Sequence, residues 1–182
     1  MIDLDDTVLV ERSLGGDTRA FGDLVGKYQR PVFNIALRLI HDVDEANDVA
    51  QATFVKAFEK LQTFDTKRKF FSWLYRIAVN ESLSACERLN RREPIRGDVA
   101  VEDAGTDDAV GQKETARHVL VALQELKLDL RAVIVLRHFQ NLSYQEIGQV
   151  LDIPARTVKS RLFTARTTLR EILVKRGIRA HD

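Results

Sequence analysis

From Asn141 to Arg170 the chain reads NLSYQEIGQVLDIPARTVKSRLFTARTTLR, a pattern that predicts two short helices joined by a tight turn. Ser143 stands three residues before Glu146, which is the spacing of a capping box and predicts a helix that begins at Tyr144. Pro154 marks the break, because the residue before a proline is pushed away from helical backbone angles, while proline itself is tolerated in the first turn of a new helix.

The second of these helices carries most of the positive charge of the chain. Residues 156–179 contain eight lysines and arginines and one acid, Glu171, although the formal net charge of the chain is only +1. Apolar residues with helical spacing are expected to face inward: Val158, Leu162, Ala165, Leu169 and Ile172. The side chains expected to face outward near the helix start are Arg156, Thr157, Lys159, Ser160, Phe163 and Thr164. This surface suits the DNA major groove; the alternative is an ordinary amphipathic helix with a solvated basic face.

The composition limits the classes of protein that the chain can belong to. Its 182 residues are enough for one medium domain or two small ones, and its single cysteine, Cys86, excludes an intramolecular disulfide. The acidic N-terminus is unlike a signal peptide, and no apolar run could span a bilayer, so we expect a cytoplasmic protein without membrane insertion. The four histidines are far apart, and no phosphate-binding loop or nucleophile motif occurs, so neither catalysis nor a metal or other cofactor is expected.

Elsewhere, helical spacing of apolar residues predicts an all-α fold, since no strand-like alternation is sustained. The further predicted helices span residues 3–14, 18–40, 45–61, 70–92, 118–126 and 130–139. Pro31 predicts a kink or a restart within the second of them, and caps are expected at Asp44 or its neighbour and at Asp129. The apolar face predicted for residues 45–61 consists of Val49, Ala52, Val55 or Thr53, Phe58 and Leu61.

Residues 93–114 differ in character from the segments on either side. They contain seven acids, two bases and three glycines, without apolar periodicity. This composition is typical of a flexible linker. We therefore predict two helical bundles, residues 1–92 and 115–182, joined by an acidic tether.

Aromatic and basic residues are interleaved between residues 67 and 92. This stretch has seven lysines and arginines against two acids, and four aromatic residues lie between positions 70 and 75. Such a surface suits single-stranded nucleic acid, whose bases stack on rings while its phosphates meet cations. The alternative is that these rings form core, because Phe70, Trp73 and Ile77 share one helix face; we expect about half of the four to be buried.

Taken together, these segments resemble the extracytoplasmic-function group of bacterial sigma factors over nearly the whole chain. The segments GDTRAFGDLVGKYQRPVFNIALRLI, DEANDVAQATFVKAF and FFSWLYRIAVNES are similar to the sigma-2 domain of that group. The segment from LVALQELKLDLRAVIVLRHF through QNLSYQEIGQVLDIPARTVKSRLFTARTTLRE is similar to its sigma-4 domain. The resemblance implies a sigma-2-like domain at residues 1–92, a linker at 93–114 and a sigma-4-like helix-turn-helix domain at 115–182.

The resemblance also implies three sets of binding residues. Residues that would dock on core RNA polymerase, at the clamp helices of its largest catalytic subunit, are Asp48, Gln51, Ala52, Thr53, Phe54 and Val55. Residues that would capture the melted minus-10 element of promoter DNA are Phe64, Lys67, Arg68, Lys69, Trp73, Arg76 and Asn80. In the recognition helix, Arg156, Lys159, Ser160, Phe163 and Thr164 would face minus-35 bases, and Thr157, Arg161 and Arg166 would bind phosphates.

Further partners that the resemblance implies are the flap of the polymerase and a sequestering anti-sigma factor. An autonomous helix-turn-helix repressor or activator is the alternative, and it would usually dimerise on a palindrome. The chain departs from the group in lacking a proline near residues 126–127 and in having Gly148 where alanine is common. Glycine weakens a helix by about 1 kcal/mol relative to alanine.

Overall fold

The computed structural model describes residues 5–92 and 118–178, and all regular secondary structure in these two ranges is helical. The all-α prediction is therefore confirmed for the described part of the chain. The predicted linker at 93–114 lies outside it. The N-terminal module consists of α1 (Asp6–Leu14), α2 (Thr18–Ile40), α3 (Val43–Lys60), a short 3-10 turn (Leu61–Thr63) and α4 (Phe70–Arg92). The C-terminal module consists of a helix at residues 118–124, α6 (Leu128–Ile134) with a π-helical turn (Val135–Phe139), α7 (Tyr144–Leu151) and α8 (Ala155–Lys175).

Helix α2 passes through Pro31 without ending, so the restart expected there does not occur. Proline inside a helix costs about 3 kcal/mol. The apolar stripe of α2 is buried on both sides of the proline, at Tyr28, Val32 and Ile35, where α2 packs against its neighbours α1, α3 and α4. Burying each of these side chains stabilises the fold by roughly 1.5–3 kcal/mol, which offsets the cost of the proline.

Helix α3 begins earlier than expected and buries a different face. Its cap is Asp42, whose carboxylate accepts a hydrogen bond from the Glu45 backbone N–H at 2.8 Å, and not Asp44. The buried positions are Ala46, Val49, Thr53 and Ala57. Of the predicted face, Val49, Leu61 and the alternative Thr53 are buried. The prediction is wrong at Val55 and Phe58, which are 57% and 51% exposed, and Ala52 is only partly buried. Small side chains at 46 and 57 form the face on which α2 and α4 pack.

The helix-turn-helix unit forms where it was predicted. The capping box is present, because the Ser143 hydroxyl accepts from the Glu146 backbone N–H while the Glu146 carboxylate accepts from the Ser143 backbone N–H at 2.9 Å. Asp152 ends α7 in the left-handed conformation with φ 56°, and α8 begins directly after Pro154. A β-carbon at Gly148 would lie 2.7 Å from the Ile153 carbonyl oxygen, so alanine there would clash with the turn.

The start of α6 corrects the expected cap at Asp129. This helix begins at Leu128, with Lys127 at the capping position and no side-chain cap, so Asp129 lies in its first turn. An acid in a first turn is favoured by the helix dipole whether or not it caps the helix.

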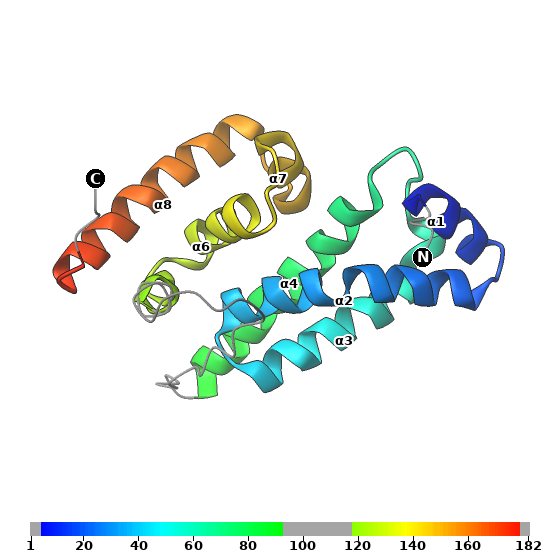
Figure 1. Ribbon diagram of the computed structural model, residues 1–182, viewed down its shortest axis with the longest axis horizontal. Helices are drawn as coiled ribbons and strands as arrows, with labels where there is room; N and C mark the ends of the chain where they lie inside the picture. Colours follow the sequence, from blue (N-terminus) through cyan, green and yellow to red (C-terminus); the bar gives the residue numbers. More distant parts are fainter. Residues whose placement is uncertain (1–4, 93–117, 179–182) are drawn as a thin grey trace, which may run out of the picture.

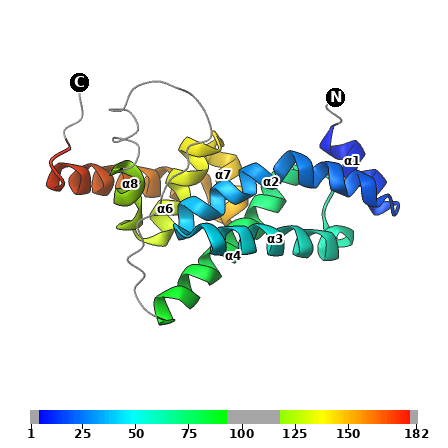
Figure 2. The same cartoon turned by 60° about the horizontal axis from the view of Figure 1, so that its bottom comes forward.

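The two modules pack against each other rather than standing apart (Figures 1 and 2). Helix α7 lies against α4, while α6 and its π-helical turn lie against α2, and buried apolar side chains of both modules form one continuous cluster. Helix α8 lies on the far side of α6 from the N-terminal module (Figure 1). This closed arrangement determines which candidate surfaces are covered.

Candidate nucleic-acid interface

The first turns of α8 present an exposed polar face. Val158, Leu162 and Ala165 are buried, as predicted, and anchor the helix against the C-terminal module. On the opposite side, the exposed members of the predicted set are Arg156, Lys159, Ser160, Phe163, Thr164 and Arg166. Phe163 is 74% exposed, the largest exposed fraction among the large apolar side chains of the described residues.

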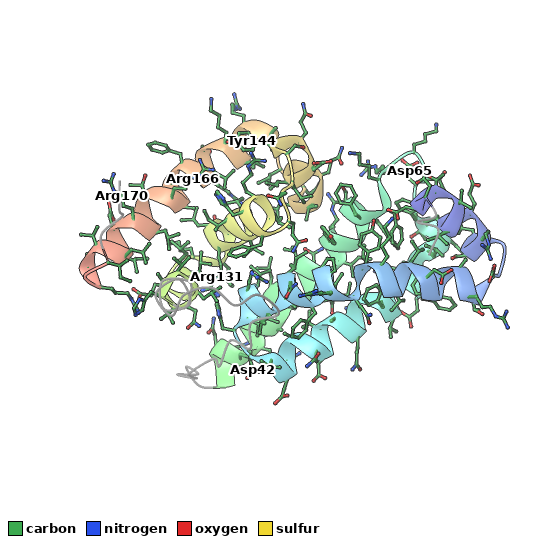
Figure 3. All side chains as sticks on the ribbon, in the orientation of Figure 1. Asp42, Asp65, Arg131, Tyr144, Arg166 and Arg170 are labelled. Carbon is green, nitrogen blue, oxygen red and sulfur yellow. The ribbon has the colours of Figure 1, made fainter. Side chains whose placement is uncertain are left out.

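The remaining two members of that set are less exposed than the other six. Thr157 and Arg161 are partly buried. The Arg161 guanidinium lies 3.6 Å from the carboxylate of Asp129 and so belongs partly to the packing of α8 on α6. Arg166, labelled in Figure 3, lies 3.3 Å from the His138 ring nitrogen Nε2. The face that projects most openly is therefore made by the other six residues.

The aromatic residues near the start of α4 form a cluster. Phe70 and Tyr75 are buried, while Phe71 and Trp73 are partly buried, so half of the four rings are buried as predicted. The Trp73 ring centroid lies 5.0 Å from that of Phe64 and 5.8 Å from that of Phe70. Phe64 is only 8% exposed, because the chain turns it inward after the 3-10 turn. Phe64 therefore supports the Trp73 ring and does not itself lie on the surface.

The basic residues predicted to bind the same DNA element differ in their surroundings. Lys67 and Arg68 are exposed, and Arg68 lies 3.6 Å from the carboxylate of Asp65. Lys69 and Arg76 instead reach acids of the C-terminal module: Lys69 pairs with Glu146 and Arg76 with Asp152, each at 2.7 Å. Asn80, also a predicted contact, is exposed at the rim of a groove of about 260 Å³ between the modules, lined also by Leu151 and Arg161.

The predicted polymerase-binding residues lie along α3. Asp48, Gln51 and Val55 are exposed, and Ala52 and Phe54 are partly buried. Thr53 is the exception, since its side chain is fully buried and its hydroxyl donates to the Val49 carbonyl oxygen at 2.7 Å. The Thr53 side chain therefore packs inside the N-terminal module and is not part of this surface.

Arg131 is a structural residue that the sequence reasoning missed. Although only 8% exposed, its guanidinium donates to the carbonyl oxygens of Leu123 at 2.8 Å, Leu126 at 3.2 Å and Gln124 within its own module. It also donates to the Leu39 carbonyl oxygen of α2 at 2.6 Å and so joins the two modules (Figure 3). The available signal was an arginine on the inward face of the otherwise apolar run LRAVIVL.

A cavity of about 350 Å³ adjoins Arg131 between the modules, and His41 and Cys86 also line it. His41 ends α2 in the left-handed conformation with φ 63°, and among the described residues its Nε2 has no hydrogen-bond partner. Burial, together with the neighbouring positive charges of Arg131 and Arg38, lowers the pKa of His41 to about 4.

The depressed pKa of His41 predicts a loss of stability in mild acid. As the pH falls below 6.5, the unfolded chain protonates this imidazole, whereas the folded chain resists protonation until about pH 4. The free energy of unfolding therefore falls by up to about 3 kcal/mol as the pH is lowered from 6.5 to 4. We expect His41→Asn, which tolerates the same backbone conformation, to flatten the pH dependence of the unfolding free energy between pH 6.5 and 4. Urea titrations at several pH values measure this, and equal slopes for both proteins would contradict it.

Nowhere in residues 5–92 and 118–178 do three or more His, Cys, Asp or Glu side chains gather as a metal site. In the same ranges, none of the helices has the length and hydropathy needed to cross a membrane.

A helix-turn-helix unit with an exposed basic second helix, packed beside a bundle with a basic and aromatic end, defines a DNA-binding protein. Comparison with known sequences identifies its family. Residues 24–92 match Sigma-70 region 2, and residues 116–169 match Sigma-70 region 4. The chain thus belongs to the sigma-70 family, and its similarity to ECF sigma factors assigns it to the extracytoplasmic-function (ECF) group.

Individual relatives agree with this assignment along most of their length. The RNA polymerase sigma-H factor of Pseudomonas aeruginosa is 38% identical over 180 residues, covering 92% of this chain and 93% of its own. The ECF RNA polymerase sigma-E factor of Haemophilus influenzae is 36% identical over 176 residues, covering 90% and 92%.

Two solved complexes share the fold. CnrH, in complex with the cytosolic domain of CnrY, aligns with a TM-score of 0.73 at 29% identity, over 93% of this chain and 97% of CnrH. The sigma factor RpoE of Bartonella quintana, in complex with the anti-sigma factor NepR, aligns with a TM-score of 0.71 at 25% identity, over 84% and 96%.

Proposed function

We propose that the chain directs core RNA polymerase to specific promoters, with separate surfaces for the polymerase, for duplex DNA and for separated strands. The observation that carries this proposal is the presence of both sigma-70 regions, in order, in one chain whose recognition helix is exposed and basic. The chain supplies binding surfaces, and the bond-forming chemistry belongs to the polymerase.

The start of α8 is the proposed reader of the minus-35 duplex. A helix fits the major groove, where Arg156 and Lys159 can donate to base edges or phosphates and Phe163 can contact a thymine methyl group. The exposure of these three side chains supports the role, because no rearrangement within the module is needed to present them. Arg166 follows on the same helix and is placed to bind a phosphate.

The loop before α4 and the first turns of that helix are the proposed site for the separated minus-10 strand. Trp73 is partly exposed, and its ring packs against those of Phe64 and Phe70. This packing fixes the ring in a position where a base could stack on it. Lys67, Arg68, Lys69 and Arg76 supply positive charge for the phosphates. Trapping unstacked bases on this surface would favour the melted state of the promoter.

The exposed side of α3 is the proposed polymerase-docking surface. It combines the polar residues Asp48 and Gln51 with the apolar Val55, which suits an interface with an apolar centre and a polar rim. Attachment to the polymerase would hold the two DNA-binding modules on one template. The second contact would then form at a high effective concentration, so that neither needs to bind DNA tightly by itself.

An anti-sigma factor is the further partner that we propose for this chain. The support is its similarity to RpoE of Bartonella quintana, which was solved in complex with the anti-sigma factor NepR, over 84% of this chain.

Run-off transcription of genomic fragments tests the function directly. Purified core polymerase with this protein is expected to produce a defined set of transcripts that neither component makes alone. The autonomous regulator predicts instead tight binding of the isolated protein to a palindromic duplex, with no new transcripts from core polymerase. That result would overturn the proposal.

A further inference from the structure

His138 lies beside the exposed face of the recognition helix. It is an exposed residue of the π-helical turn that continues α6, and its ring nitrogen Nε2 lies 3.3 Å from the guanidinium of Arg166 on α8. Arg166 follows Lys159 by seven positions, which is about two helical turns, so both project from the same side of α8. The imidazole therefore stands next to the face proposed to read duplex DNA, although it belongs to a different element of the module.

The contact with Arg166 determines the state of the imidazole in the free protein. A guanidinium has only hydrogen-bond donors, so the His138 Nε2 atom accepts, and the neutral ring carries its proton on Nδ1. Partial removal from water, and then the positive charges of Arg166 and Arg137, lower the pKa of His138 from its ordinary value. The ring is therefore neutral in the free protein near pH 7.

The charged groups around this turn are positive. Arg38 of α2 lies over the ring of Phe139 at 4.2 Å, and Arg137 of the turn lies over the Tyr144 ring of α7 at 5.4 Å, each distance running from the guanidinium carbon to the ring centroid. Arg166 approaches from α8. Among the described residues, none of these three arginines pairs with an acid. Cations gathered around one ionisable ring on an exposed face favour the binding of an anion.

We infer that His138 is a proton-linked ligand of the DNA backbone: with Arg166 it binds one phosphate of the duplex that α8 reads, and it takes up a proton from solvent on doing so. The phosphate supplies negative charge beside the ring, which favours the imidazolium. Protonated Nε2 no longer accepts from Arg166, so both groups donate to phosphate oxygens. This inference rests on the proposed function, because it requires α8 to meet duplex DNA, and it adds a contact from outside that helix.

Linkage determines the sign of the pH dependence. The DNA-bound state holds a proton that the free state does not, so the affinity for duplex DNA rises as the pH falls. A rise of roughly 0.5 to 1 unit in the pKa of His138 on binding corresponds to an affinity gain of about 3- to 10-fold between high and low pH. His41 in the folded chain stays neutral down to about pH 4, so it takes up no proton in the range where His138 titrates.

Fluorescence anisotropy of the full chain, with a labelled random-sequence duplex of about 20 base pairs at low salt, tests the inference. A random sequence suffices because a phosphate contact does not depend on the bases. The wild type is expected to bind roughly 2- to 10-fold more tightly at about pH 5.5 than at about pH 8. His138→Gln can still accept from Arg166 but stays uncharged, so it should lose this gain.

Two further variants make the test specific to the charge at this position. His138→Arg carries a permanent charge, so at both pH values it should bind about as tightly as the wild type does at low pH. The matched control is His118→Gln, which removes another histidine of the same module and should keep the wild-type gain. Circular dichroism at both pH values shows that each variant is folded.

The possible failures are distinguishable. An equal pH dependence in the wild type and in His138→Gln overturns the inference, and so does a loss of affinity in His138→Gln that is the same at both pH values. If Lys159→Ala and Arg166→Ala weaken duplex binding while His138→Gln keeps the pH dependence, only this inference fails. If neither alanine variant weakens binding at either pH, the assignment of duplex binding to α8 fails together with it.

Discussion

Replacing Arg131 with alanine is expected to lower the free energy of unfolding by roughly 3–5 kcal/mol. The guanidinium serves four backbone carbonyl groups, those of Leu39, Leu123, Gln124 and Leu126, and all would lose this donor together. The Leu39 and Leu123 carbonyl oxygens would keep a second donor, from Cys86 Sγ and the Leu126 backbone N–H. A buried carbonyl left without a partner costs about 1–3 kcal/mol, and water entering the neighbouring cavity would recover part of the loss. Chemical denaturation followed by circular dichroism measures the change.

A control arginine distinguishes this effect from a general effect of losing charge. Arg88 pairs with Glu45, but 47% of its side chain is exposed, so Arg88→Ala should cost less than about 1 kcal/mol. Arg131→Lys is expected to fall between the two, because one ammonium group cannot reach four carbonyls arranged around a planar guanidinium. Equal losses for Arg131→Ala and Arg88→Ala would show that the buried hydrogen bonds of Arg131 contribute little.

The second large effect concerns promoter recognition. Lys159→Ala and Phe163→Ala should each reduce transcription from a cognate promoter by about 5- to 150-fold, the range for one lost base contact. Both side chains are exposed, so the protein should stay folded and bind core polymerase with unchanged affinity. Lys175→Ala, an exposed cation in the last turn of the same helix, is the matched control and should retain most activity.

Asp48→Arg should produce the opposite pattern. This exposed residue of α3 belongs to the proposed polymerase surface, and reversing its charge should weaken polymerase binding while leaving duplex DNA binding intact. Co-sedimentation with core polymerase and gel-shift assays separate the two properties. If Asp48→Arg and Lys159→Ala each lose both activities to the same extent, the proposed division between surfaces is wrong.

Local signals in the sequence were enough for most helix positions. The Ser143 and Glu146 capping box and the spans of α2 and α4 each depend on residues close together in the chain, and each forms as predicted. The outward face of α8 was also predictable, because a single buried stripe through Val158, Leu162 and Ala165 determines the orientation of the whole helix.

The buried face of α3 is the part of the fold that apolar periodicity alone predicted incorrectly. Val55 and Phe58 look like core residues by hydropathy, yet the structure exposes them and buries Ala46 and Ala57. When a helix has apolar residues on several sides, the helices that pack on it determine which side is buried. Helices α2 and α4 lie on the side with the small residues. The resemblance to a family had already placed Val55 at a binding surface, which its exposure supports.

The helices, the helix-turn-helix unit and its basic surface could be predicted from the sequence, because caps, turns and apolar periodicity act between residues a few positions apart. That Arg131 joins the modules, and that Lys69 and Arg76 face α7, became clear from the packing of the folded chain. These contacts join residues up to 92 positions apart in the chain. No local pattern encodes such pairs, since they depend on how two separately predictable modules pack together.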